Sequence, residues 1–267
     1  MNHRIAILGG GNIGLSLAKG LVKSGTFFAK DIFITRRNIN SLDTFKDQEF
    51  QITTDNKLAV ESSEVIILAV LPQQLKALLA EIKPFIYPGK HLVISLVTGV
   101  SIAEIKKALF EDLAIVRAMP NTAIAVGESI SCLVFEPLSR PYQKLVVDIF
   151  ETVGTQVEIQ EELMTSATAL GACGIAFFLR AIRAATQGGI EIGFHASEAL
   201  KIALQVAKGA ALLLEQPGSH PENEIDKVTS PRGCTIAGLN EMEHKGFSSA
   251  LIMGIKTSAE KAGHLYE

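Results

Sequence analysis

Short apolar runs alternate with amphipathic stretches along the first part of the chain. The runs are nearly continuous and rich in β-branched residues, which predicts buried strands at Arg4–Leu8, Asp31–Thr35, Val65–Val70, Leu92–Leu96 and Leu113–Arg117. Apolar residues recur at helical spacing in residues 12–23, and further helices are predicted at about 73–82, 101–110 and 139–152. This alternation indicates a parallel, doubly wound α/β sheet of the Rossmann-like kind. Two more strands, Ile130–Phe135 and Gln156–Ile159, are expected to complete the sheet at one edge.

The pattern changes near residue 160. Beyond it no strand is indicated, and apolar positions follow helical spacing over residues 161–187, 197–215 and 247–265, on faces rich in Ala, Gly and Ser. We therefore predict two domains, an α/β domain over residues 1–159 and an all-α domain over 160–267. Small side chains let helix backbones approach closely, and few bulky residues are present to fill one compact core. This favours an intertwined helical dimer, with packing inside one chain as the alternative.

A glycine-rich turn directly follows the first predicted strand. Gly9, Gly11 and Gly14 form the spacing GxGxxG where the first helix opens. Glycine there permits a tight turn, close backbone approach to a pyrophosphate and close packing of helix on strand, while the helix N-terminus attracts the anion. The context predicts a dinucleotide site, and the alternative is a glycine turn that only packs.

The end of the second strand indicates which dinucleotide is bound. NAD-binding folds usually place Asp or Glu there to hold the ribose hydroxyls. This chain has Thr35, Arg36 and Arg37 instead, with no acid before Asp43. Guanidinium groups suit a 2′-phosphate, so NADPH is favoured over NADH, and a solvated basic loop is the alternative.

A second anion site is predicted in the all-α domain. Ser230 suits a helix N-cap and Pro231 the first helical position, which would leave the amides of Arg232 to Thr235 free to bind an anion. The hydroxyls of Ser230 and Thr235 would add donors for a small carboxylate. The alternative is an ordinary, well-capped surface helix.

Composition removes several other classes of function. With 25 Lys and Arg against 28 Asp and Glu the net charge is −3, which gives no broad electrostatic case for nucleic acid or an anionic membrane. Mean hydropathy is high, at +0.29, but the longest dense apolar run ends at Pro72, well short of the about 20 residues of a spanning helix. No signal peptide is expected at the N-terminus. The three cysteines lack CxxC spacing and fit a reducing cytoplasm, and no metal site is expected.

Several segments occur together in one order. They are ILGGGNIG at 7–14, ILAVLPQQ at 67–74, VISLVTGVSI at 93–102, VRAMPNTAIAVGE at 116–128, TALGACG at 168–174, GAALLL at 209–214 and VTSPRGCTIAGLNEMEHKGF at 228–247. Together they resemble the pyrroline-5-carboxylate reductase family, and the resemblance covers nearly the whole chain. The resemblance implies a Rossmann-like N-terminal domain and a helical C-terminal domain that forms a homodimer, often stacked into larger rings such as a decamer.

The resemblance also implies site residues. The cofactor is expected at Gly9, Gly10, Gly11, Asn12, Ile13, Gly14, Thr35, Arg36, Arg37, Asn56, Ala69, Val70, Leu71 and Pro72, with Val97 and Thr98 beside the nicotinamide. The carboxylate of the substrate, a cyclic imino acid, is expected at Ser230, Gly233, Cys234 and Thr235. The Thr235 hydroxyl is expected near the ring nitrogen, with Glu161 nearby.

The chain departs from the family pattern in three places. SGSGPAY stands here as GACGIAF at 171–177, Leu71 replaces the lysine of AVKP, and SPGGTT has become SPRGCT. The backbone amides and Thr235 remain. The expected activity is NADPH-dependent reduction of 1-pyrroline-5-carboxylate to L-proline in the cytoplasm. The alternatives are a β-hydroxyacid dehydrogenase, which the absence of lysine between Lys144 and Lys201 disfavours, and a non-catalytic NADP-sensing protein.

Overall fold

The computed structural model describes residues 3–38 and 42–263. Their contacts divide the chain into two compact units. Unit 1 contains residues 1–173 and 259–267, and unit 2 contains residues 174–258. Each unit is described by itself below.

One sheet of eight strands, among the described residues, forms the centre of unit 1. Its order is β3-β2-β1-β4-β5-β6-β7-β8, and its strands are β1 Ile5–Leu8, β2 Ile32–Thr35, β3 Gln51–Thr53, β4 Val65–Leu68, β5 Leu92–Ser95, β6 Ala114–Met119, β7 Ser129–Phe135 and β8 Gly154–Glu158. All neighbours pair in parallel except β6 and β7. The predicted parallel sheet is confirmed, and β7 and β8 complete it at one edge.

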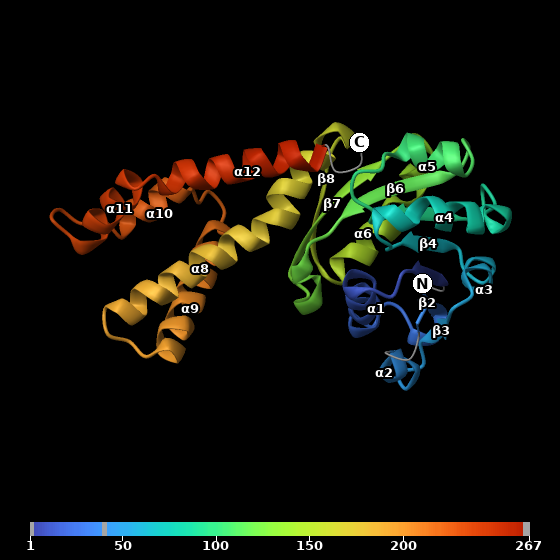
Figure 1. The fold of residues 1–267 in the computed structure, drawn as a ribbon, viewed down its shortest axis with the longest axis horizontal. Coiled ribbons are helices and arrows are strands. Elements are labelled where there is room, and N and C mark those ends of the chain that lie inside the picture. Colours follow the sequence, from blue (N-terminus) through green and yellow to red (C-terminus); the bar gives the residue numbers. More distant parts are fainter. Residues whose placement is uncertain (1–2, 39–41, 264–267) are drawn as a thin grey trace. The chain divides into compact units, whose positions relative to one another are not determined.

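Helices cover both faces of this sheet. They are α1 Asn12–Lys23, α2 Asp43–Lys46, α3 Asn56–Glu61, α4 Pro72–Ile82, α5 Ile102–Ala108 and α6 Gln143–Glu151. Apolar side chains of α1, α2 and α6 form one core with the strands, and those of α3, α4 and α5 form the other. Figure 1 shows α4 and α5 on one side of the strands and α1 and α6 on the other. Both cores exclude water, as a doubly wound sheet requires.

The strand order reverses at β1. Its neighbours are β2 on one side and β4 on the other, so the connections leave β1 and β4 in opposite directions. Ligands of open α/β sheets bind in the crevice outside the carboxyl ends of the strands at such a switch point. The loops after β1, β2 and β4 therefore border the predicted site.

Three short elements of the first half, α2, β3 and α3, were not predicted from the sequence. The edge strand β3 has only three residues, two of them polar, and α3 has six. All three are too short for hydrophobic periodicity to detect. The α3 helix nevertheless carries Asn56 to the end of β2.

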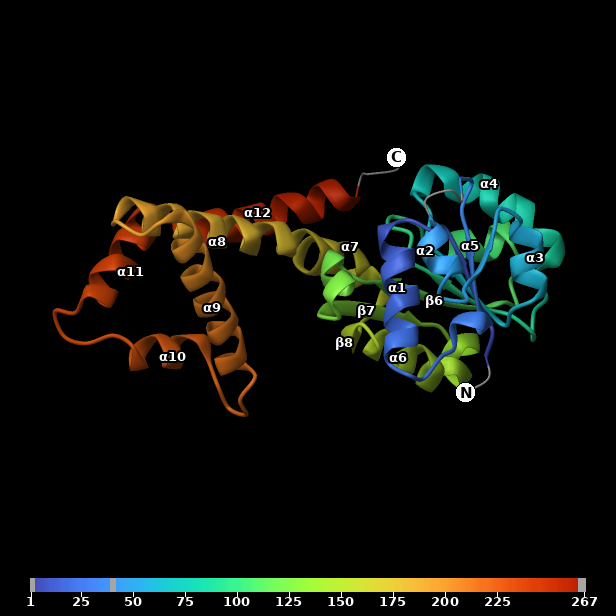
Figure 2. The same ribbon diagram turned by 90° about the horizontal axis from the view of Figure 1, so that it is seen from below.

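The chain from residue 161 onward is helical. It contains a short 3₁₀ turn at Glu161–Leu163, α7 Met164–Ala167, a π-helical segment Thr168–Cys173, α8 Gly174–Glu191, α9 Ala196–Leu214, α10 Pro221–Lys227, α11 Cys234–His244 and α12 Phe247–Gly263. Figure 2 labels the helices of unit 2, which are α8 to α11 and α12 as far as residue 258. The predicted absence of strands here is confirmed for the described residues. The last two residues of the helix predicted at 247–265 lie outside them.

The contacts group residues 161–173 with the sheet rather than with the later helices. Side-chain bonds explain this grouping. Arg117 of β6 pairs with Glu161, and Asn121 donates to the Gly171 carbonyl. Unit 1 thus extends beyond residue 159, where the sequence predicts the domain boundary, and that boundary stays a prediction.

One helical run in the described chain, Glu161–Glu191, is long and apolar enough by length and composition to cross a membrane. The expectation that no stretch is long and apolar enough for a spanning helix was wrong, because it counted only unbroken runs of bulky apolar residues. Alanine and glycine keep this run apolar on average although Arg180 and Arg183 interrupt it. A large share of this apolar surface is exposed in the single chain.

Candidate functional site

The turn after β1 needs glycine at Gly9 and Gly14. Gly9 has a φ of +120°, and the amides of Gly9 and Gly10 donate to the Thr35 carbonyl at 3.2 and 2.7 Å. A Cβ on Gly14 would collide with the Gly9 carbonyl oxygen. Helix α1 then begins at Asn12 with no side-chain cap. Its first amides have no helical partner and supply an anion site at the end of β1.

A cavity of about 1,040 Å³ lies along the carboxyl ends of the strands. This volume is at the upper end of the about 300–1,000 Å³ of ligand sites, which is ample for a dinucleotide. The sequence-predicted cofactor residues that line it are Gly9, Gly10, Gly11, Asn12, Ile13, Thr35, Arg36, Arg37, Asn56, Ala69, Val70, Leu71, Pro72 and Thr98. Two predicted residues do not line it, since Gly14 supports the turn from behind and Val97 is buried.

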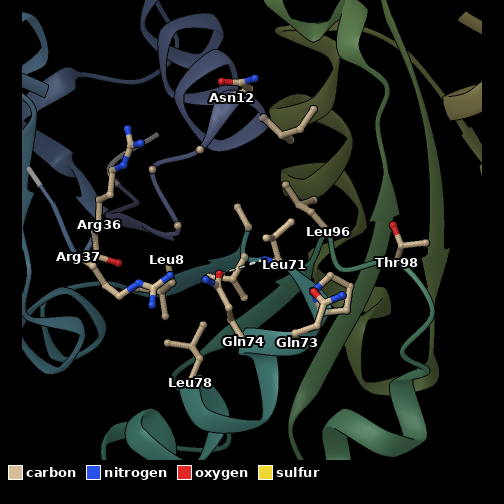
Figure 3. A pocket seen from close by; sticks show the side chains of 18 of the residues that line it. Leu8, Asn12, Arg36, Arg37, Leu71, Gln73, Gln74, Leu78, Leu96 and Thr98 are labelled. Carbon is tan, nitrogen blue, oxygen red and sulfur yellow. Dashed lines mark hydrogen bonds between the residues drawn. The ribbon is translucent and has the colours of Figure 1, made fainter. Parts of the chain in front are cut away.

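The two ends of the cavity differ in chemistry. Figure 3 shows Arg36 and Arg37 on one side, after β2, and Thr98 on the other, after β5. The arginine end suits phosphate, because guanidinium groups form charge-assisted hydrogen bonds with its oxygens. At the other end the Thr98 hydroxyl lies 4.0 Å from the Met119 sulfur. Leu71, which replaces the family's lysine, is 64 % exposed on the cavity wall.

An acid stands near the arginine end, but it comes from α4 rather than from β2. The Thr35 hydroxyl donates to Asn56 Oδ1 at 2.6 Å, and Asn56 Nδ2 donates to Glu81 Oε1 at 3.0 Å. All three residues line the cavity. The prediction that no acid follows β2 is correct along the chain, yet the fold brings Glu81 to the same corner.

Asn121 joins the cavity to the π-helical segment. This residue is buried, its Nδ2 donates to the Gly171 carbonyl at 3.1 Å, and its Oδ1 accepts from the Ala123 amide at 3.0 Å. Ala172, the next residue of that segment, lines the cavity. The altered segment GACG is thus held at the cavity by a side-chain hydrogen bond to its backbone, which does not depend on serine hydroxyls.

Glu161 has a clear structural environment. Its Oε1 accepts from the Ile102 amide at 2.8 Å, at the start of α5, and from Arg117 Nη1 at 3.0 Å. The Arg117 side chain is 8 % exposed and that of Glu161 is 32 % exposed. This carboxylate therefore caps α5 and neutralises a buried cation. Its expected contact with substrate stays a prediction.

The predicted anion turn of unit 2 differs in detail from the expectation. Helix α11 begins at Cys234 with Gly233 as its N-cap, so Ser230 is not the N-cap and Pro231 is not the first helical residue. Arg232 has a φ of +61°, which no helix residue adopts, and the Gly233 amide donates to the Ser230 carbonyl at 2.9 Å. The helix therefore begins three residues later than predicted, at Cys234 rather than at Pro231. The amides of Cys234 and Thr235 still lie in the uncapped first turn of an eleven-residue helix.

Gly233 is closely packed against Ser230 in this second turn. A Cβ on Gly233 would lie 2.5 Å from the Ser230 hydroxyl oxygen. The Ser230 side chain therefore lies directly over the start of α11. A hydroxyl and free helix amides next to each other can receive a small carboxylate.

Other chemistry has little support. Among residues 3–38 and 42–263, no three His, Cys, Asp or Glu side chains gather where they could hold a metal ion. The thiols of Cys132, Cys173 and Cys234 are free, and burial raises the pKa of Cys132. A thiol whose pKa is raised is a weaker nucleophile at neutral pH.

Sequence reasoning missed several wall residues. Gln74, Leu78 and Glu81 follow one face of α4, and Met119 to Thr122 follow the end of β6. The second group could have been found, because carboxyl ends of adjacent parallel strands border one crevice. The first group needs the register of α4 against the cavity, which the helical pattern alone does not provide.

Two family models match this chain. Residues 161–265 match the model described as pyrroline-5-carboxylate reductase dimerisation. Residues 4–99, which contain the glycine turn, match the model described as NADP oxidoreductase coenzyme F420-dependent. Each match falls on the part of the chain where the corresponding feature was predicted.

Curated relatives extend the similarity over the full chain. A Dictyostelium discoideum protein named pyrroline-5-carboxylate reductase 1 is 49 % identical over 99 % of this chain, which spans about half (50 %) of that relative's length. A second one from the same organism, pyrroline-5-carboxylate reductase 2, is 47 % identical and covers 98 % of this chain and 92 % of its own.

A solved structure shows the same fold. The Plasmodium falciparum pyrroline carboxylate reductase with NADP bound matches with a TM-score of 0.90 and 24 % identity, over 100 % of this chain and 99 % of the other. The relative at 47 % identity, which this chain covers almost completely, shows the family. The glycine turn, the turn before α11 and the cavity at the strand ends agree with it. The chain belongs to the pyrroline-5-carboxylate reductase family.

Proposed function

We propose that this protein is an NADPH-dependent reductase of 1-pyrroline-5-carboxylate that produces L-proline. The observation that carries the proposal is the cavity at the switch point, which has a glycine turn and an arginine pair at one end. Curated relatives that match nearly the whole of this chain are named pyrroline-5-carboxylate reductases. The two alternative hypotheses, a β-hydroxyacid dehydrogenase and a non-catalytic NADP-sensing protein, are distinguished from this proposal by an activity assay.

The cavity fits the dinucleotide. Its glycine turn leaves no room for side chains at Gly9 and Gly14 and offers the first amides of α1 to a pyrophosphate. Arg36 and Arg37 would hold the 2′-phosphate, with Thr35 and Asn56 beside the same ribose, which favours NADPH over NADH. The loop Ala69 to Pro72 and Thr98 would hold the nicotinamide half, with Val97 supporting them from the core. When bound, NADPH supplies the hydride that reduces the carbon of the C=N bond.

The start of α11 would bind the substrate. The amides of Cys234 and Thr235 and the Ser230 hydroxyl would receive the carboxylate, with Gly233 allowing their close approach. The Thr235 hydroxyl would hydrogen-bond the ring nitrogen, and Glu161 would contribute from nearby. The product amine takes its proton from water or from the protonated imine itself. No strong general base is needed, so catalysis is mostly positioning.

The assembly belongs to the same proposal. We place the NADP-binding domain at residues 1–159 and the substrate-binding and dimerisation domain at residues 160–267. The helices of the second domain would form a homodimer, and dimers would stack into a larger ring such as a decamer. Large apolar side chains are exposed on α8 and α9 of the single chain, which supports burial of these helices against a second copy of the chain. A reducing cytoplasm suits the free thiols.

A spectrophotometric assay tests the activity. We expect NADPH absorbance to fall with 1-pyrroline-5-carboxylate, and no NADPH to form from NADP⁺ and a 3-hydroxy acid. Turnover only with the 3-hydroxy acid would support a β-hydroxyacid dehydrogenase. Binding of NADPH without turnover on either substrate would support a sensor.

A further inference from the structure

Three polar side chains from three elements meet at the arginine end of the cavity. Thr35 ends β2, Asn56 begins α3, and Glu81 is the last residue but one of α4. The Thr35 hydroxyl lies 2.6 Å from Asn56 Oδ1, and Asn56 Nδ2 lies 3.0 Å from Glu81 Oε1. Thr35 is buried, while Glu81 is exposed at the rim.

The direction of each bond follows from the chemistry of Glu81. An ionised carboxylate only accepts hydrogen bonds, so the Asn56 amide must turn its NH₂ group toward Glu81. Asn56 Oδ1 then faces Thr35 and accepts the proton of that hydroxyl. One residue at the rim therefore sets the orientation of the other two.

This orientation determines what the cavity offers to a ligand. The Thr35 oxygen, having donated its proton, is left as an acceptor, and the second N–H of Asn56 is left as a donor. A ribose hydroxyl can donate to the first, and a phosphate oxygen can accept from the second. The opposite amide orientation would turn Asn56 Oδ1 toward the phosphate. Both the amide oxygen and the phosphate oxygen are acceptors, so they could not form a hydrogen bond.

We propose that Glu81 is a positioning residue that determines how this chain binds the phosphorylated ribose of NADPH. It acts through Asn56, by holding that amide with its N–H groups available and by keeping the Thr35 oxygen free to accept. The proposal rests on the proposed function, because it takes the cavity to be the NADPH site.

Charge alone predicts the opposite effect. A carboxylate beside an anion site repels phosphate, so its removal should strengthen binding. Glu81 is exposed and its charge is screened by water and salt, whereas its hydrogen bond to Asn56 is direct. We therefore expect the loss of the hydrogen bond to dominate.

Direct binding of NADP⁺ to the full chain, by isothermal titration calorimetry, separates the two effects. We expect Glu81→Ala to weaken NADP⁺ binding about fivefold, the size of one lost hydrogen bond. Glu81→Gln keeps an acceptor without the charge, and we expect it to recover binding to within about twofold of the wild type. The control is Glu61→Ala, at the exposed last residue of α3, and it should bind like the wild type. Tighter binding in both Glu81 variants would overturn the proposal in favour of charge repulsion.

A double-mutant cycle tests whether Glu81 acts through Asn56. With Asn56→Ala already present, Glu81→Ala should change NADP⁺ binding by less than about twofold, because the amide it orients is gone. The same fivefold loss in both backgrounds would overturn the proposal. Thermal unfolding of each variant checks that folding is intact, and 2′,5′-ADP as a second probe should reproduce the losses. A wild type that binds no NADP⁺ would instead refute the proposed function.

Discussion

His91 is fully buried and directly precedes β5. Burial and the neighbouring Lys90 ammonium lower its pKa from 6.5 to about 4. Its Nδ1 accepts a hydrogen bond from the Tyr87 amide at 3.0 Å. A protonated ring would point a second N–H at that amide, so the fold keeps this histidine neutral.

This burial predicts a stability that depends on pH. Between pH 6.5 and 4 the unfolded chain binds a proton at His91 that the folded chain does not, so stability falls as pH falls through this window. The loss amounts to about 3 kcal/mol, and it is complete below pH 4. Urea unfolding of the wild type and His91→Gln across this range measures it, since carboxylate effects cancel in the difference. We expect the two curves to converge as pH falls. His244→Gln, at the exposed end of α11, is the control, and parallel curves for His91→Gln would refute the assignment.

Thr235, the second residue of α11, carries the proposed contact with the imine nitrogen. Thr235→Ala should lower turnover about tenfold, or about 1.4 kcal/mol for one lost hydrogen bond. Alanine favours a helix, so the fold should not suffer. Steady-state kinetics with 1-pyrroline-5-carboxylate measure the change, and Thr235→Ser, which keeps the hydroxyl, should retain most of the activity. An unchanged rate in Thr235→Ala would exclude this contact.

At the scale of elements, one ion pair fastens the start of α5 to the sheet. Glu161 accepts from the Ile102 amide and from Arg117, whose side chain is almost completely buried. Thr98 lies in the loop that leads into α5 and lines the cavity. The Arg117–Glu161 ion pair thus supports the cavity wall at Thr98 without lining the cavity itself.

Because Arg117 is more deeply buried than Glu161, removing the two partners should lower the free energy of unfolding by different amounts. Removing Glu161 leaves a buried guanidinium without its anion, whereas removing Arg117 leaves a carboxylate that water can reach. Glu161→Ala should therefore cost about 3 kcal/mol and Arg117→Met about 1 kcal/mol in the free energy of unfolding. Denaturant unfolding of both variants gives the order, with Lys144→Met, part of an exposed pair, as the control near zero. Equal costs would mean that both charges are hydrated to the same degree.

Elements with a strong apolar signal were predictable from the sequence. The buried strands were found within one or two residues of their ends, because near-continuous apolar runs have no other use in a doubly wound sheet. Turn geometry was not predictable at Ser230 to Cys234, since the positive φ of Arg232 gives no signal in composition. The role of Glu81 was hidden for a different reason. Its meeting with Asn56 depends on how α3 and α4 pack, and no local pattern records that.

At the scale of the whole molecule, the high mean hydropathy of the chain, +0.29, now has a location. Part of it lies in the two cores on either side of the sheet. Another part lies on α8 and α9, where Phe178 and Val206 are each 65 % exposed. Large exposed apolar surfaces mark association sites. The match of residues 161–265 to a dimerisation model agrees with this reading.

A charge placed on this surface should therefore break the proposed homodimer. Phe178→Arg replaces a large apolar side chain on α8 with one that cannot be buried without a partner. We expect the dissociation constant of the dimer to rise at least about 30-fold, or about 2 kcal/mol, the loss typical of a central interface residue. Analytical ultracentrifugation over a range of concentrations measures it. Gln187→Arg adds the same charge at an exposed polar position of the same helix and controls for net charge. A Phe178→Arg variant that associates as tightly as Gln187→Arg would place the dimer surface elsewhere, and the apolar face of α8 would then need another partner.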